Sequence, residues 1–270
     1  MAKSGKNFMK IIKKIPLIML FWTRVIALLL VAAMYTLRIY FRKFTRRLSK
    51  ERIAKYGAQW AEKINMVLGV KITKIGAVPD KTAMVISNHR SYMDIPAIFQ
   101  FLPCSMVAKK EVESWPIIGF VTKINNTIYV DRKDPDSRKI TRDKMKKTIL
   151  NNIPVVIFPE GTSYAGPGIL KFKKGAFVTA ADTNTPVVPV AVEYKDKDSA
   201  WVDDDTFAAH FYRTFTKPKL EVILHFGPAI EHQNPEILHK KTWDWINTSL
   251  KNINKGVRVN GTEKKEEILV

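Results

Sequence analysis

The chain has 270 residues, of which 46% are hydrophobic, so it is long enough for one substantial α/β domain plus an appendage. Its mean hydropathy is slightly negative, which excludes a polytopic membrane protein, and its single cysteine, Cys104, excludes an internal disulfide and a cysteine-based zinc site. The formal charge of +20 indicates an anionic partner, either nucleic acid, anionic lipid or an anionic substrate.

The first 50 residues are the most basic part of the chain. They contain twelve Lys or Arg and no acidic residue, arranged around an apolar run over 15–37 whose one charge is Arg24. Basic clusters around an apolar run are expected at an anionic membrane surface. We find no nucleic-acid-binding motif in the sequence. We therefore predict a membrane anchor over 1–50, with anionic membrane lipids as partners and no nucleic acid.

The sequence leaves three interpretations of this anchor open: a single spanning helix, a pair of short helices lying in one leaflet, and a cleavable signal peptide. Roughly 20 apolar residues suffice to cross a bilayer, but a charge near the centre, as Arg24 would be, costs about 2.5–3.5 kcal/mol. The signal peptide is the weakest interpretation, because no small-residue cleavage site follows the run. Basic residues on both flanks favour the in-plane anchor.

Short apolar runs alternate with helical segments over the predicted domain, residues 51–254. The runs are strand-sized and lack strict alternation, as expected of strands buried on both faces: 70–75, 83–87, 127–130, 155–158, 187–192 and 220–226. Helices are predicted over 48–68, 137–150, 172–182 and 235–253, a surface loop over 195–206, and a polar tail over 255–270. The predicted fold class is α/β, with a mixed, largely parallel sheet flanked by helices.

A first chemical motif, Asn88-His89-Arg90-Ser91-Tyr92-Met93-Asp94, follows the 83–87 run. If a helix starts near Ser91, Asp94 falls in its first turn and its carboxylate can reach the imidazole of His89. A carboxylate on one ring nitrogen fixes the tautomer and leaves the other nitrogen free as a base, as in the histidine–aspartate half of a catalytic triad. The competing interpretation is a capping box, in which Ser91 and Asp94 only begin a helix.

A second motif, Phe158-Pro159-Glu160-Gly161-Thr162-Ser163, follows the 155–158 run. Two glycines and three lysines come next: Gly166, Gly168, Lys171, Lys173 and Lys174. Backbone amides of such a turn can form an anion-binding nest, to which lysines add charge. The alternative is an ordinary turn with a solvated basic face.

The two motifs, about 70 residues apart, together resemble the glycerolipid acyltransferases, which include the 1-acylglycerol-3-phosphate acyltransferases. Two lesser blocks also resemble that family in the right order. The first runs from Lys109 through Trp115-Pro116-Ile117-Ile118-Gly119 to Tyr129-Val130-Asp131-Arg132, and the second is Thr185-Pro186-Val187-Val188-Pro189-Val190. The resemblance covers roughly residues 65 to 230.

The resemblance implies a mechanism. His89, oriented by Asp94, takes the proton from an acceptor hydroxyl, and the alkoxide attacks the thioester carbonyl of acyl-CoA or acyl carrier protein. Neither a metal nor a cofactor beyond this co-substrate is implied. The residues expected to bind the glycerol-phosphate part of the acceptor are Arg132, Glu160, Gly161, Thr162, Ser163 and Lys173.

One departure concerns the acceptor. Many phosphatidate-forming members have an arginine directly after Glu-Gly-Thr, where this chain has Ser163, and an arginine fork suits a phosphate monoester. We expect an acyltransferase for 1-acylglycerol-3-phosphate, on the cytoplasmic side of the inner membrane, where acyl thioesters are made. The alternatives are another lysolipid (lysophosphatidylethanolamine or a lyso-ornithine lipid), thioester hydrolysis, and a non-catalytic membrane-binding relative.

Overall fold

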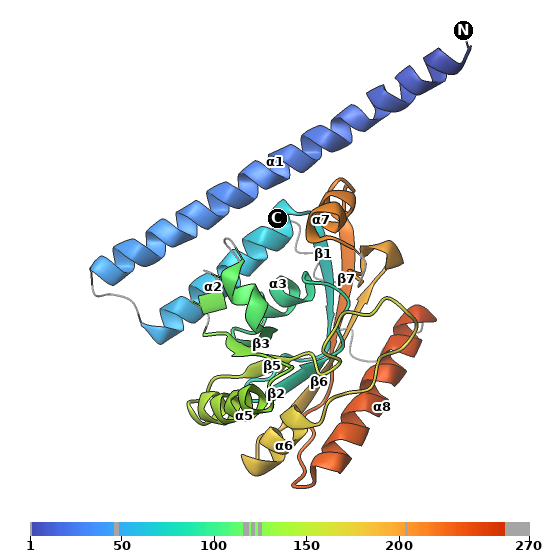
Figure 1. Cartoon of the computed structure of the whole chain (residues 1–270). Helices are drawn as coiled ribbons and strands as arrows, with labels where there is room; N and C mark the ends of the chain where they lie inside the picture. The colour runs from blue at the N-terminus through green and yellow to red at the C-terminus, as the bar shows by residue number, and fades with distance from the viewer. Residues whose placement is uncertain are drawn as a thin grey trace.

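A twisted sheet with helices on both faces forms the body of the molecule (Figure 1). The computed structural model describes residues 2–45, 49–115, 119, 122–123, 126–202 and 205–256. Within them the sheet has seven strands in the order β1-β7-β6-β2-β5-β3-β4, and every neighbouring pair is parallel except β6 and β7. The predicted α/β class with a mixed, largely parallel sheet is confirmed.

The strands lie close to the predicted runs. They are β1 (Val70–Ile75), β2 (Met84–Ser87), β3 (Ser105–Lys109), β4 (Ile128–Val130), β5 (Val155–Ile157), β6 (Val187–Tyr194) and β7 (Leu220–Phe226). β2 is central: Met84 pairs with Val155 of β5 on one side and with Val187 of β6 on the other. The sequence does not predict β3, because this strand begins with serine, ends with lysine and has only one β-branched residue.

Two groups of helices cover the two faces of the sheet. α2 (Lys50–Val67), α3 (Asp94–Phe99) and α7 (Phe207–Phe215) pack on one face, and α5 (Pro135–Leu150), α6 (Gly175–Asp182) and α8 (Pro235–Asn254) pack on the other. Two short 3₁₀ turns, η1 (Lys110–Ser114) and η2 (Lys197–Ser199), complete the described elements. Each face therefore has its own apolar core.

The predicted helices are confirmed with small shifts at their ends. α5 begins before the predicted Ser137, because the Asp134 side chain accepts a hydrogen bond from the Asp136 amide and Pro135 occupies the first turn. α6 begins later than predicted, at Gly175. α7 is not among the predicted helices, because its nine residues follow a polar segment. The available signal was Thr206, the N-cap residue, whose side chain accepts from the Ala209 amide.

The anchor is one helix, α1 (Ala2–Phe44), which lies across one end of the domain (Figure 1). The prediction of two short helices is wrong, because residues 17–44 contain neither glycine nor proline to break the helix. Its segment Ile15–Phe44 is long and apolar enough to cross a membrane, by length and composition. Arg46 and Arg47 of the basic flank, and 257–270 of the predicted tail, lie outside the described residues.

Candidate active site

The site lies where parallel strands of the sheet end. His89 follows β2, the Glu160 turn follows β5, and Arg132 follows β4. The carboxyl ends of parallel strands face the same edge of a sheet, which is where ligands bind in open α/β folds. The sheet order therefore brings together three motifs that are far apart in the sequence.

His89 and Asp94 form a hydrogen-bonded pair. The Nδ1 atom of His89 lies 2.7 Å from the Oδ2 atom of Asp94, whose side chain is fully buried, while the His89 side chain is 20% exposed. The same Oδ2 atom accepts from the backbone amides of Arg90 (2.7 Å) and Ser91 (3.0 Å), and Oδ1 accepts from the Tyr194 hydroxyl (2.7 Å). A carboxylate held in this way requires the proton on Nδ1, which leaves Nε2 of His89 as the basic nitrogen.

The arrangement answers the capping-box alternative. Asp94 is the first residue of α3, but the N-cap residue, Met93, makes no side-chain cap. The Asp94 carboxylate does accept from the Ser91 amide (3.0 Å), as the acidic member of a capping box would. Capping is not its only role, because the same oxygen also binds the His89 imidazole and the Arg90 amide.

Two further contacts fix the position of His89, one at its ring and one at the residue before it. The ring of His89 stacks on Phe158, with centroids 4.3 Å apart and an interplanar angle of 21°. The Asn88 amide makes a two-way bond with the backbone of Val192, donating to its carbonyl (2.9 Å) and accepting from its amide (2.8 Å). The end of β2 is thus attached to β6, and the side chain of His89 starts from a rigid point.

Glu160 connects the two motifs. One carboxylate oxygen accepts from the His89 amide (2.8 Å) and the other from the Leu170 amide (2.9 Å), in a buried position. Burial raises the pKa of Glu160, and the two amides and the Arg90 guanidinium act in the opposite direction. Both oxygens therefore face the backbone, and the expected contact of Glu160 with the acceptor stays a prediction.

A cluster of cations lies around Gly161. The Arg132 guanidinium donates to the Gly161 carbonyl, and a Cβ atom placed on Gly161 would lie 2.7 Å from Nζ of Lys173. Gly161 has a φ of +81°, so a side chain there would also be strained. The pKa of Lys173 is lowered by burial and by the cations Arg132, Arg138 and Lys109. So much positive charge in one place suits an anionic ligand.

Ser163 and Thr162 complete the turn. The Ser163 hydroxyl donates to the Trp201 carbonyl, and the Trp201 amide donates to the Arg90 carbonyl (2.8 Å). The Ser163 side chain is therefore engaged with the segment between β6 and α7. Thr162 is partly buried.

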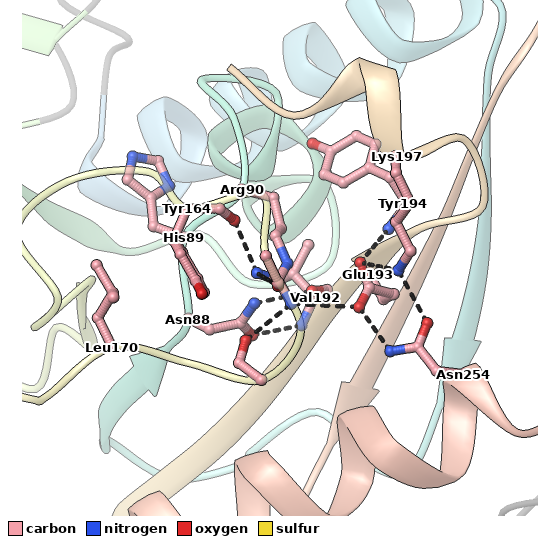
Figure 2. A network of polar contacts seen from close by, with 12 residues as sticks. Asn88, His89, Arg90, Tyr164, Leu170, Val192, Glu193, Tyr194, Lys197 and Asn254 are labelled. Carbon is pink, nitrogen blue, oxygen red and sulfur yellow. Dashed lines mark hydrogen bonds and ion pairs between the residues drawn. The ribbon is translucent and has the colours of Figure 1, made fainter. Parts of the chain in front are cut away.

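Arg90 is the site residue that the sequence motifs did not single out. Its buried guanidinium donates to the carbonyls of Tyr164 (2.7 Å), Gly166 (3.1 Å) and Gly168 (3.0 Å), and forms an ion pair with Glu193 (3.2 Å). Figure 2 shows Arg90 between the loop of Tyr164 and the strand of Glu193. A charged residue inside an otherwise apolar strand, as Glu193 is in β6, was the available signal.

The fold and the site define an α/β protein with a histidine–aspartate pair and an adjoining cationic turn at the carboxyl edge of its sheet. Residues 69–193 match the family model described as Acyltransferase. The crystal structure of the 1-acyl-sn-glycerophosphate (LPA) acyltransferase from Thermotoga maritima superimposes with a TM-score of 0.71 over 89% of this chain and 97% of that chain, at 21% identity. That likeness shows the fold.

Curated relatives agree with the family match. The chain is 26% identical to the lyso-ornithine lipid O-acyltransferase of Pseudomonas aeruginosa, over 57% of this chain and 61% of that protein. It is 28% identical to the 1-acyl-sn-glycerol-3-phosphate acyltransferase of Neisseria gonorrhoeae, over 48% of this chain and 51% of that protein. The matches thus span less than two thirds of these relatives. Residues 69–193 thus match an acyltransferase model, and the relatives are acyltransferases of the kind that the motifs resemble.

Proposed function

We propose that the protein transfers an acyl chain from acyl-CoA or acyl carrier protein to the free hydroxyl of 1-acyl-sn-glycerol-3-phosphate, giving phosphatidate. The observation that carries the proposal is the His89–Asp94 pair at the same sheet edge as the cations around Gly161. The pair supplies a base for a hydroxyl, and the cations supply a place for a phosphate.

His89 acts first in this mechanism. Its Nε2 atom takes the proton from the acceptor hydroxyl as the hydroxyl oxygen attacks the thioester carbonyl, and the imidazolium that forms is stabilised by the buried Asp94 carboxylate. The tetrahedral intermediate then collapses, the bond from carbon to sulfur breaks, and the proton on Nε2 passes to the leaving thiolate. The products are the ester and the free thiol, so the atoms and electrons balance without a further co-reactant.

Arg132 and Lys173 hold the acceptor in this proposal. A guanidinium can bind a phosphate through two parallel hydrogen bonds, and an ammonium adds a point charge. Both side chains lie next to Gly161, which has no Cβ and so leaves the turn open. Gly161, Thr162 and Glu160 shape the turn against which the glycerol would lie.

A second acceptor class has a specific observation in its favour. Ser163, which stands where many phosphatidate-forming members have arginine, is bonded to the Trp201 carbonyl and brings no charge to the turn. Lyso-ornithine lipid O-acyltransferases are among the relatives of this chain, with 26% identity in the case of Rhizobium meliloti. An acyltransferase for a lyso-ornithine lipid or lysophosphatidylethanolamine is therefore the alternative.

We place the reaction at the cytoplasmic face of the inner membrane. The apolar helix α1 and the lipid-acylating relatives suggest membrane association, and acyl thioesters are made in the cytoplasm. Anionic lipids are the proposed membrane partners, because the anchor region, residues 1–50, contains twelve Lys or Arg and no acidic residue.

An acceptor panel tests the proposal. The purified full chain in vesicles would receive a labelled acyl-CoA and, in turn, 1-acylglycerol-3-phosphate, lysophosphatidylethanolamine and a lyso-ornithine lipid. We expect phosphatidate as the main product. Product from another lysolipid alone would replace the acceptor but keep the mechanism, and release of free acid without any ester would indicate hydrolysis. The absence of both products, with acyl carrier protein as donor too, would contradict the proposal.

A further inference from the structure

Arg24, the one charge in the apolar run, is buried against the catalytic domain. Its Nη1 atom donates to the carbonyls of Phe215 (3.0 Å) and Lys217 (2.6 Å), and its Nη2 atom donates to the carbonyl of Pro218 (2.7 Å). These carbonyls lie at and just beyond the end of α7, where helical carbonyls lack partners and the helix dipole is negative. The charge is therefore satisfied by the domain and not by lipid or water.

The receiving site is built for a guanidinium. Gly69, in the turn between α2 and β1, has a φ of +71°, and a Cβ atom there would lie 2.2 Å from Nη2 of Arg24 and 2.8 Å from the Pro218 carbonyl oxygen. The Gly69 carbonyl accepts from the amide of Leu220, the first residue of β7 (2.9 Å). Three segments of the domain thus meet around one side chain of α1.

Arg24 belongs to a face of α1 that packs on the domain. Phe21 makes edge contacts with Phe211 (5.9 Å) and Tyr212 (4.9 Å) of α7, and Tyr35 is buried farther along the helix. Positions 21, 24, 28 and 35 follow the spacing of one helical face. The other face exposes large apolar side chains, including Trp22, Leu30 and Phe41. One face of α1 packs on the domain and the other is apolar. This arrangement suits a helix that lies in the surface of a bilayer better than a helix that spans it.

α7 continues from this contact to the active site. Phe207, at the other end of α7, packs against Tyr92, with ring centroids 5.0 Å apart. The Tyr92 hydroxyl lies 3.0 Å from Nδ1 of His210, also on α7. Tyr92 belongs to the segment between His89 and Asp94, so the helix that receives Arg24 also packs against the catalytic loop.

We propose that Arg24 is a positioning residue that fixes the catalytic domain to its membrane anchor, so that the active site keeps one orientation toward the bilayer that holds the acceptor. The inference rests on the proposed function and extends it from the chemistry to the presentation of a membrane-borne substrate. In this proposal Arg24 acts through its contact with the domain. The alternative is that Arg24 has no role beyond weakening the insertion of α1 into the membrane.

Arg24→Leu separates these two roles. Leucine makes α1 more apolar, so a residue that mattered only to insertion would bind vesicles as well or better and lose no activity. We expect unchanged vesicle binding and a fall of about tenfold or more in kcat/KM for a long-chain lysolipid embedded in vesicles, since loss of orientation lowers the rate strongly. With a short-chain, water-soluble lysolipid we expect a change of less than about twofold, because the chemistry of His89 and Asp94 is intact.

Two further variants make the test specific. On zwitterionic vesicles, where the charge of the anchor contributes little to binding, Lys43→Leu removes a charge of the same sign from an exposed position of α1 and should leave both activities unchanged. Gly69→Ala disturbs the receiving site without changing α1 and should reproduce the loss confined to vesicles. Full activity of Arg24→Leu on vesicles would overturn the inference, and so would equal loss on both acceptors, which would make Arg24 a folding residue. If instead the proposed function were wrong, the unmodified chain would be inactive with both the vesicle-embedded and the water-soluble lysolipid, so the two failures can be told apart.

Discussion

At the scale of single residues, the site depends on a carboxylate whose oxygens are fully engaged. Asp94 accepts from the imidazole of His89, two backbone amides and the hydroxyl of Tyr194. Burial, followed by the charge of Asp94, raises the pKa of Tyr194 well above its ordinary value, so this hydroxyl stays protonated and remains a donor. The orientation of His89 is therefore set before a substrate binds.

His89→Ala should lower kcat by about 10²–10⁴-fold, because general-base help of this kind is removed. The variant should keep its fold, since the His89 side chain makes one hydrogen bond and its backbone contacts remain. Acyl transfer from labelled acyl-CoA would measure kcat, and circular dichroism would show whether the fold is kept. Activity close to that of the unmodified chain would refute the assignment of the base.

Arg132→Ala should raise the acceptor KM about tenfold to a hundredfold, because a charged hydrogen bond contributes roughly 1.5–3 kcal/mol. The donor KM should stay nearly constant. Lys174→Ala is the matched control: it removes a nearby cation that is exposed and paired with Glu236 (2.7 Å). Steady-state kinetics with each substrate varied in turn would measure both constants. An unchanged acceptor KM in Arg132→Ala would remove this residue from the phosphate site.

At the scale of elements, Arg90 joins parts of the chain that local structure keeps apart. It ties the loop of Tyr164 and Gly168 to β6 through Glu193, and Glu193 also accepts from Asn254 at the end of α8 (3.0 Å). The loop that follows the Glu160 turn has no regular structure of its own over 158–174. Its shape therefore depends on contacts with the rest of the domain, among them those of Arg90, Glu160 and the Ser163 hydroxyl with the Trp201 carbonyl.

Arg90→Met should lower the free energy of unfolding by about 3–5 kcal/mol, because it leaves the buried Glu193 carboxylate and three carbonyls without this partner. Adding Glu193→Gln should recover part of the loss, since the buried charge is then gone. Lys240→Met, which breaks the exposed pair with Asp244, should change stability by only about 0–1 kcal/mol. Denaturant unfolding would measure all three. A loss equal to that of Lys240→Met would show that the buried pair contributes little.

At the scale of the whole molecule, the charge is concentrated on the anchor. The net charge is +20, and the first 50 residues contribute twelve cations without an acid. The exposed face of α1 supplies apolar area next to those cations. Membrane binding should therefore have an electrostatic part and an apolar part.

Binding to vesicles with anionic lipid should weaken about tenfold or more between low salt and roughly 0.5 M salt, because each lysine or arginine near such a surface contributes about 1 kcal/mol that salt screens. Binding to zwitterionic vesicles should be weaker and nearly independent of salt. Co-sedimentation of the full chain would measure both. Equal affinity for the two vesicle types at low salt would contradict a role for anionic lipid.

The sequence by itself determined most of the strands and helices and the pairing of His89 with Asp94. β1 and β7 begin and end where their apolar runs do, and Asp94 reaches His89 because five residues at a strand-to-helix turn allow only a short loop. Local signals failed where they were weak. β3 has few β-branched residues, and α7 is short and follows a polar segment.

Only the tertiary structure decided which distant residues meet. Tyr194 binds Asp94 from 100 positions away, and Arg132 reaches Gly161 across the sheet edge. Arg24 finds its carbonyls 191 to 194 positions along the chain, which turned an unfavourable charge in an apolar helix into a contact with the domain. The physical reason is the same in each case. Periodicity and capping act within a few residues, whereas these contacts depend on strand order and on how helices pack over the sheet.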